Sequence, residues 1–516
     1  MTTSAPPAPP AAPGPSVAQK GLKLGAIGLI SSIVIAVAST APAYSLTSAL
    51  GSVAGEVGAK SPIIILIAFV PMLFISYAYK ALNNVDPDCG TSFTWVARAF
   101  GRRTGWITGW VIVAADVIVM ANLAQIAGSY TYQLLGLTDL ANNTWAVTVL
   151  GCGWTLLMTL IAWVGIELSA RMQVILLGLE LLVLAIFAVV ALIAVYSGHG
   201  SETSTHVSFG WFSPAGLTAA ELSAGFLAGV FIYWGWDSAV AANEETTDSK
   251  VTPGRAAVIS TVILLGIYLL VTVAAQAYAG TGETGIGLLN PDNSADVLSG
   301  VGQGVMGTWG FKLLVLAILS SAAASAQTTI LPTARTTLAM AAYRALPKSF
   351  GAVHPRYQTP TVSTWAMGIV SIVFYAALTK FNPDALNDLI LSIGLLIAFY
   401  YGLTGFASFW YFLRNGELKQ GGKALWLKGI LPLLGGVILL AAFIKSTIDF
   451  TKSDSGSTHF FGLGGPFVLG IGSILLGVIL MIIYNIVAPA YFKGDTMRQG
   501  TVVTETGEVI PTSESG

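Results

Sequence analysis

Twelve long apolar stretches, separated by short polar segments, run through this chain of 516 residues. Each is roughly 17 to 30 residues long, and a hydrocarbon core of about 30 Å requires about 20 residues in helical form. Helices and closed barrels alone satisfy the backbone inside a bilayer, and these stretches are too long for barrel strands. The pattern therefore predicts an all-α polytopic membrane protein. The twelve spans are predicted to begin near Leu24, Ile63, Trp106, Trp145, Met172, Leu217, Ala256, Trp309, Val362, Leu389, Leu427 and Gly462.

Two of the apolar stretches are interrupted near their middle. Residues 24–50 contain the polar break Ser39-Thr40-Ala41-Pro42, and residues 217–242 contain Tyr233-Trp234-Gly235-Trp236-Asp237. A helix broken inside a bilayer leaves backbone groups unpaired, which is tolerated only where they face protein, water or a ligand. A matching pair of breaks in two halves of a chain is typical of a transporter's substrate site. The alternative is that Pro42 and Gly235 only kink their helices.

Composition and charge agree with a membrane protein. Charged residues make up 9% of the chain and hydrophobic residues 54%, and the mean hydropathy is +0.75. The net charge of −1 gives no indication of nucleic acid binding. Most of the Lys and Arg residues fall on one side of the predicted spans, which places both termini in the cytoplasm. Richness in Ala and Gly suggests a bacterial plasma (inner) membrane.

Both ends of the chain are predicted to be disordered cytoplasmic tails. Residues 1–20 are rich in Pro and Ala without the apolar core of a signal peptide, and residues 493–516 are polar. The two cysteines, Cys89 and Cys152, indicate neither a disulfide nor a metal centre. The four histidines are scattered and show no metal-ligand spacing. We therefore expect no cofactor, no metal and no enzymatic activity.

Three segments resemble one transporter family. Residues 90–101 read GTSFTWVARAFG, residues 231–245 read FIYWGWDSAVAANEE, and the loop at 346–360 contains LPK and HPRYQTP. These resemble, in register with the spans, the amino acid, polyamine and organocation (APC) superfamily, and in particular its bacterial amino acid permeases.

The resemblance implies a LeuT-like fold of five helices plus five in inverted repeat, with helices 1 and 6 broken, followed by two accessory helices. The first repeat would occupy residues 21–200, the second 201–413 and the accessory spans 414–492. It also implies a secondary active transporter for an amino acid or a related amine. A polyamine or amino alcohol permease or exchanger is the alternative function. A nutrient sensor without flux and an intramembrane enzyme are more distant alternatives.

The two breaks supply the candidate substrate site. The first offers free N–H groups and a positive half-helix end, which suit a carboxylate, and the second offers carbonyls and aromatic faces, which suit an ammonium group. Many relatives have Gly-x-Gly in the first break, whereas Pro42 here has no N–H to give. The predicted substrate-binding residues are Ser39, Thr40, Ala41, Ala43, Tyr233, Trp234, Trp236 and Asp237.

Intramembrane carboxylates supply the candidate coupling site. Glu180 lies in an apolar span with no basic neighbour in sequence, so we expect it to carry a proton. Hydroxyls of the eighth span leave open a sodium site instead, and a purely structural Glu180 is the further alternative. The predicted coupling residues are Glu180, Asp116, Ser321 and Ser325.

Four further residues are candidates for a gate. Tyr400 and Tyr401 of the tenth span can close over an ammonium group. Glu244 and Glu245 are expected to pair with basic loop residues such as Arg98, Arg102 and Arg103 in one transport state, unless they form a solvated acidic loop.

Overall fold

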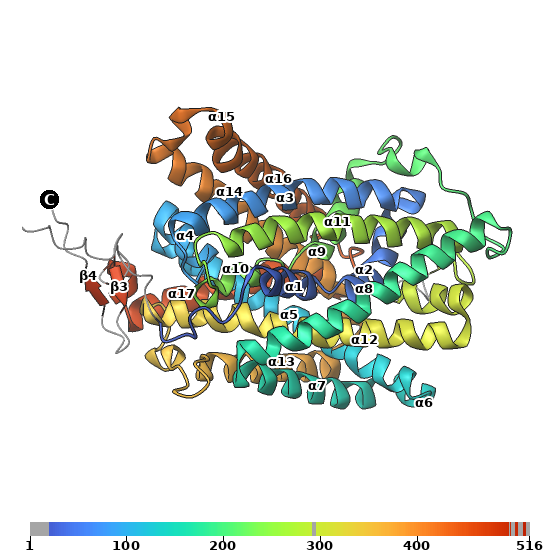
Figure 1. Cartoon of the computed structure of the whole chain (residues 1–516), viewed down its shortest axis with the longest axis horizontal. Helices are drawn as coiled ribbons and strands as arrows, with labels where there is room; N and C mark the ends of the chain where they lie inside the picture. The colour runs from blue at the N-terminus through green and yellow to red at the C-terminus, as the bar shows by residue number, and fades with distance from the viewer. Residues whose placement is uncertain (1–19, 291–295, 495, 497–500, 504–508, 512–516) are drawn as a thin grey trace, which may run out of the picture.

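The computed structural model describes residues 20–290, 296–494, 496, 501–503 and 509–511. Residues 1–19 of the predicted N-terminal tail, and most of the predicted C-terminal tail, lie outside the described residues. The long helices lie side by side along the long axis of the molecule in a single bundle (Figure 1). Helix α4 (Ser92–Phe100) and the strands β3 (Thr501–Val503) and β4 (Val509–Pro511) are at one end of this bundle, and helix α6 (Thr138–Ala141) is at the other.

Both predicted interruptions are present. The first apolar stretch forms α1 (Leu29–Thr40) and α2 (Pro42–Val57), with Ala41 between them in the left-handed conformation at φ 48°. The second forms α9 (Ala219–Ile232) and the short α10 (Ser238–Ala241), separated by five non-helical residues in which Gly235 has φ 121°. Pro42 occupies the first position of α2, where its missing N–H costs the helix no hydrogen bond.

The other long helices begin within a few residues of the predicted positions, with one exception. The eighth predicted span begins at Trp309, whereas the helix begins at Val297 and is kinked at Gly307, where φ is 64°. The predicted span is therefore the part of this helix after the kink. These helices are α3 (Ser61–Val85), α5 (Arg102–Leu134), α7 (Thr144–Val164), α8 (Ile166–Tyr196), α11 (Thr252–Ala279), α12 (Val297–Ala342), α13 (Thr361–Phe381), α14 (Leu389–Arg414), α16 (Leu431–Asp449) and α17 (Gly465–Val487).

Short elements connect the long helices. The described part of the chain contains two antiparallel pairs of short strands, β1 with β2 and β3 with β4, and the second pair lies in the segment predicted as a tail. The short elements are η1 (Gly58–Lys60), α4 (Ser92–Phe100), α6 (Thr138–Ala141), η2 (Phe209–Phe212), η3 (Asn243–Glu245), η5 (Lys348–Gly351), η6 (Pro383–Asp388), η7 (Glu417–Gln420), α15 (Gly422–Ala424), the π-helix η8 (Leu425–Ile430), β1 (His459–Phe460), β2 (Leu463–Gly464), α18 (Ala490–Lys493), β3 (Thr501–Val503) and β4 (Val509–Pro511).

The chain crosses the membrane several times. Within the described residues, ten helical stretches are long and apolar enough to span a bilayer, and one of them, residues 29–85, contains the first two predicted spans. Helix α9 is apolar but shorter. Helices α5, α12 and α14 are the most buried of the long spans, whereas few residues of α16 and α17 are buried.

Candidate functional site

The two helix interruptions are in direct contact. The hydroxyls of Ser39 and Ser238 are 2.7 Å apart. A Cβ atom at Gly235 would lie 2.8 Å from the carbonyl carbon and oxygen of Ser39 and 3.0 Å from the backbone nitrogen of Thr40. Together with its positive φ, this close approach requires glycine at position 235. The backbones of the two breaks therefore touch with no side chain between them.

The amide groups at the start of α2 already have partners within the protein. The Ala43 N–H donates to Glu180 Oε1 at 2.7 Å, and the Tyr44 N–H donates to Ser321 Oγ at 3.2 Å. The N-terminus of a helix carries a positive partial charge that favours an anion. Glu180 occupies this position, so the amides that we expected to receive a substrate carboxylate are bonded to the protein itself.

The carbonyl groups at the end of α1 are also satisfied. Ser325 Oγ donates to the carbonyl of Ser39 at 2.9 Å, and Ser45 Oγ donates to that of Thr40 at 2.6 Å. The Thr40 hydroxyl donates to the carbonyl of Val37 at 2.6 Å. Side-chain hydroxyls of α1, α2 and α12 thus replace the hydrogen bonds that the break removes.

Glu180 joins three helices. It lies on α8 with no exposed surface, and its Oε1 also accepts a hydrogen bond from the Ser321 hydroxyl of α12 at 2.8 Å. Its second oxygen, Oε2, has no hydrogen-bond partner among the described residues. Ser325, predicted to act beside it, turns to the carbonyl of Ser39 instead. The carboxyl group therefore has one bonded and one unbonded oxygen at the first break.

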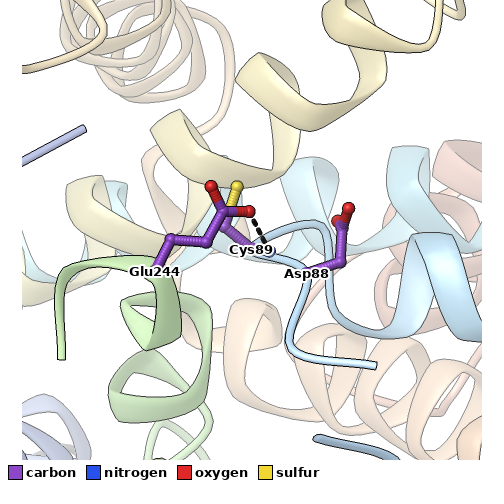
Figure 2. Close-up of side chains that lie close together, drawn as sticks. All are labelled: Asp88, Cys89 and Glu244. Carbon is purple, nitrogen blue, oxygen red and sulfur yellow. Dashed lines mark hydrogen bonds between the residues drawn. The ribbon is translucent and has the colours of Figure 1, made fainter. Parts of the chain in front are cut away.

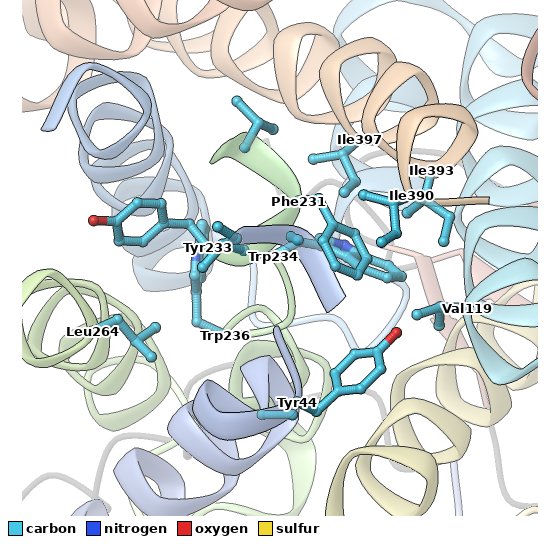
Figure 3. Close-up of a cluster of buried hydrophobic side chains, with 14 of the residues drawn as sticks. Tyr44, Val119, Phe231, Tyr233, Trp234, Trp236, Leu264, Ile390, Ile393 and Ile397 are labelled. Carbon is cyan, nitrogen blue, oxygen red and sulfur yellow. The ribbon is translucent and has the colours of Figure 1, made fainter. Parts of the chain in front are cut away.

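A small cavity lies between the two breaks. Its volume is about 10 Å³, which is room for about one water molecule. Figure 3 shows Tyr44, Val119, Phe231 and Trp234 around this space. A substrate the size of an amino acid requires the surrounding side chains to move apart. The lining residues are Ser39, Thr40, Tyr44, Ser45, Val119, Phe231, Trp234, Ser325 and Thr329.

The three aromatic residues of the second break point in different directions. Trp234 lines the cavity. The Tyr233 hydroxyl donates to the carbonyl of Ile65 at 3.2 Å, and its ring is turned away from the cavity (Figure 3). The Trp236 ring packs edge-on against Tyr79 with centroids 5.0 Å apart. These three residues therefore do not form one aromatic cage in this structure.

Behind Trp234 lies a hydrogen-bonded chain that ends at Asp237. The Trp234 indole N–H donates to the Tyr400 hydroxyl, which in turn donates to Asp237 Oδ2 at 3.1 Å. The ring of Tyr401 packs against Tyr400 and Trp236, with centroids 4.6 Å and 5.2 Å away. The predicted gate tyrosines of α14 thus contact the second break directly.

Asp116, the third predicted intramembrane carboxylate, is on α5. It is buried and accepts a hydrogen bond from the Thr333 hydroxyl of α12. Its partner differs from those of Glu180, so the structure does not bring the two predicted coupling carboxylates into one hydrogen-bonded group.

A second cluster lies at the predicted cytoplasmic end of the bundle. The Lys20 ammonium is 3.0 Å from Asp88 Oδ2 and 2.5 Å from Glu244 Oε1, and these three side chains are at most 5% exposed. Figure 2 shows Asp88, Cys89 and Glu244 together, with the Cys89 N–H donating to Glu244 at 3.0 Å. One thiol and two carboxylates also make a possible metal-binding set. Because Lys20 already supplies a positive charge to both carboxylates, we interpret the set as an ion-pair cluster.

The Lys20 ammonium affects the pKa of both carboxyl groups in this cluster. Burial alone would raise the pKa of Asp88, but the Lys20 ammonium, the Arg98 guanidinium and the Tyr343 hydroxyl hold that pKa well below its usual range. Burial raises the pKa of Glu244, although Lys20 opposes this. The Lys20 ammonium therefore favours the ionised form of both carboxyls, and most strongly that of Asp88.

Two expectations about this end of the bundle are not met in this structure. Lys20, assigned to the disordered tail, is buried in the ion-pair cluster. Glu244 and Glu245 are neither solvated nor paired with loop arginines, since Glu244 bonds Lys20 and Glu245 receives two hydrogen bonds, at 2.8 and 3.0 Å, from Arg335. Arg335 lies inside α12 and is 1% exposed. Arg98 pairs instead with Asp86 at 2.5 Å.

Sequence reasoning also missed residues that line the cavity. Tyr44 and Ser45 lie on the first turn of α2, on the same side as the break, and a helical projection of this turn would have found them. Phe231, Val119 and Thr329 carry no sequence signal, because an apolar or hydroxyl residue in a membrane helix is ordinary.

Two discontinuous helices in contact, with a buried carboxyl at one break, are the arrangement typical of the substrate site of a multi-pass membrane transporter. The sequence model of the family described as amino acid permease matches residues 26–461. The chain belongs to this family, and its relatives are permeases of the APC superfamily.

The names of individual relatives refer to different substrates. The chain is 26% identical over 426 residues to the branched-chain amino acid permease BcaP of Lactococcus lactis, covering 79% of this chain and 84% of that protein. It is 21% identical over 412 residues to the low-affinity putrescine importer PlaP of Escherichia coli, covering 78% and 84%. It is 26% identical over 396 residues to the vacuolar cationic amino acid transporter 4 of Arabidopsis thaliana, covering 74% and 62%. The relatives therefore include transporters of amino acids and of an amine.

Proposed function

We propose that this permease carries an amino acid or a related amine across a bacterial plasma membrane in symport with a proton, and that Glu180 carries the proton. The observation that supports this most directly is the hydrogen bond from the Ala43 N–H to Glu180 Oε1. It attaches the carboxyl to the first break, beside the cavity. Protonation of Glu180 weakens its attraction to the helix N-terminus, so proton binding and movement of α2 are linked.

A proton suits this carboxyl better than sodium. A sodium site needs several oxygens directed at one point. The Ser321 hydroxyl does point at Glu180, but the hydroxyl of Ser325 points at the Ser39 carbonyl and that of Ser320 at the carbonyl of Ala317. The unbonded Oε2 of Glu180 is the atom on which we place the transported proton.

The substrate would bind where the two breaks meet, between Ser39, Thr40 and Trp234, with Tyr400 and Asp237 behind the tryptophan. One observation also supports an amine as the substrate. The amides of Ala43 and Tyr44 are bonded to the protein, whereas Asp237 places a carboxyl group at the opposite break. Aromatic faces and a carboxylate together recognise an ammonium group. A cationic amine is therefore the second candidate substrate class.

Two measurements test these proposals. A thermal-shift screen of amino acids, diamines and amino alcohols identifies the substrate class, because a ligand at 100 times its dissociation constant stabilises the folded protein by about 2.7 kcal/mol. Uptake of that substrate is then measured in proteoliposomes under an imposed inward proton gradient, with a sodium gradient as the alternative.

The decisive variant is Glu180→Gln, which keeps the hydrogen-bonding shape of the neutral acid. We expect it to abolish stimulation by the proton gradient while exchange of labelled for unlabelled substrate continues. Glu202→Gln, at an exposed position between α8 and α9, is the matched control and should behave as the wild type. Undiminished gradient-driven accumulation by Glu180→Gln would make Glu180 a structural residue.

A further inference from the structure

A basic pocket opens at the predicted cytoplasmic end of the bundle, away from the cavity between the breaks. It has a volume of about 690 Å³ and lies between the end of α3, helix α4, the start of α5 and the end of α14. Among the described residues, three arginines line it, Arg98, Arg102 and Arg414, together with one acidic residue, Asp86. Because Arg98 pairs with Asp86 at 2.5 Å, the pocket retains the positive charges of Arg102 and Arg414.

These two arginines are available to an anion. Arg102 donates to a neutral acceptor, the carbonyl of Phe492, at 3.3 Å, and Arg414 is exposed. Neither forms an ion pair within the part of the chain that the structure describes. Tyr411 and Asn415 add polar groups to the same lining. A guanidinium group that has no anionic partner can donate two hydrogen bonds to one phosphate group, so these two arginines suit a phosphate ligand.

An apolar groove adjoins the pocket. It has a volume of about 410 Å³ and shares Trp410 with the pocket. The Trp410 side chain is half exposed, as is typical of tryptophans at the level of the lipid headgroups. The groove runs between the α4–α5 junction and α14, along helices that span the membrane. Its lining residues are Phe100, Thr104, Leu403, Phe406, Phe409 and Trp410.

A positively charged pocket that continues into an apolar groove matches a molecule with an anionic head and a hydrocarbon chain. A free phosphate or a soluble anion would leave the groove empty, and a neutral lipid would leave Arg102 and Arg414 without a counter-charge. We propose that this site binds an anionic phospholipid, with its phosphate between Arg102 and Arg414 and one acyl chain in the groove. The site is independent of the proposed proton coupling and of the transported substrate.

The test uses the purified full-length protein in detergent, with phosphatidylglycerol as the probe and phosphatidylcholine as the neutral comparison. Binding is measured by native mass spectrometry and by the shift of the melting temperature. Arg102→Gln/Arg414→Gln should bind phosphatidylglycerol about thirtyfold more weakly, since each basic residue at a lipid surface contributes about fivefold. Arg255→Gln/Arg356→Gln removes two exposed arginines outside the pocket and should bind as the wild type. Equal binding by both double variants overturns the proposal.

Two additional measurements separate a lipid from a soluble anion and from a folding defect. Thr104→Phe narrows the groove, so it should weaken phosphatidylglycerol without changing the binding of glycerol phosphate. Full competition by glycerol phosphate at the concentration at which phosphatidylglycerol binds would show a soluble-anion site and overturn the lipid assignment. If loss of the Arg102 contact with Phe492 prevents folding, Arg414→Gln alone should still weaken lipid binding about fivefold.

Discussion

Replacing Lys20 tests whether the ion-pair cluster holds the predicted cytoplasmic end closed. Lys20→Met keeps most of the apolar stem but leaves Asp88 and Glu244 buried without their ammonium partner, which is now 3.0 and 2.5 Å away. Removing one member of a buried ion pair costs about 3–5 kcal/mol. A cost of 1.4 kcal/mol changes an equilibrium about tenfold, so the closed arrangement should lose at least about a hundredfold in population relative to open forms. Lys20→Arg keeps the charge and is the control.

Cys89 reports this opening. Its thiol is fully buried and donates to the carbonyl of Arg335 at 3.6 Å, so a membrane-impermeant thiol reagent reaches it only when the cluster separates. The assay is the labelling rate of Cys89 in a Cys152→Ser background, which removes the other cysteine of the chain. We expect Lys20→Met to label much faster than the parent and Lys20→Arg to label at a rate close to the parent's.

The pH dependence of this variant has a definite sign. In the wild type, the depressed pKa of Asp88 means that this carboxylate stabilises the cluster above the ordinary pKa of an aspartate, so titration of Asp88 should not change labelling between about pH 6 and about pH 8. Without Lys20, the effect of burial that already raises the pKa of Glu244 is no longer opposed by the ammonium, so the closed form takes up a proton there at low pH. Closure of the variant should then be favoured as the pH falls and lost as the pH rises. Rates are divided by the parent's rate at the same pH, which removes the thiol's own titration.

Equal labelling of the parent and Lys20→Met at all pH values would refute the reasoning, because it would mean that the ammonium contributes nothing to closure. If Cys89 were labelled as fast in Lys20→Arg as in Lys20→Met, the reasoning would also be refuted, since the effect would then come from packing and not from charge.

Two further predictions concern other parts of the site. Arg335→Gln should lower the free energy of unfolding by about 3–5 kcal/mol, because Glu245 is left buried without its partner. The double variant with Glu245→Gln should recover part of this loss. Additive losses of stability in the thermal melts would contradict the pairing. Trp234→Ala should weaken substrate binding in a titration of the purified protein, whereas Trp236→Ala, which removes a ring packed against Tyr79 outside the cavity lining, should lower thermal stability with less effect on affinity. The opposite ranking of the two affinities would place the site elsewhere.

The fold was predictable because hydrophobic length and chain breaks are local properties. The run of apolar residues fixes where a helix can cross the membrane, and Pro42 or Gly235 inside such a run marks where it cannot continue. The helix at Val297 shows the limit of this reasoning. Its first part, residues 297–306, contains Gly, Ser and Gln among its apolar residues and so lacks a long apolar run, and Gly307 then kinks the helix before the more apolar part begins.

The site was less predictable because it depends on contacts between residues far apart in the sequence. Glu180 could be recognised as an unusual carboxyl in an apolar span, but its attachment to Ala43 requires two helices to be placed side by side. Lys20 looked like part of a tail, since a basic residue after a Pro-rich segment is normally exposed, and only the carboxylates of Asp88 and Glu244 make its burial favourable.

The contact at Gly235 has a mechanical consequence for how this protein changes shape. The Gly235 backbone lies directly against the backbone of Ser39 and Thr40, so no rotamer change can absorb a displacement of one break relative to the other. A small displacement of either broken helix therefore displaces the other. We therefore expect the two breaks to move together as a rigid unit. Substrate bound at one break would then change the position of the other through the backbone contact alone.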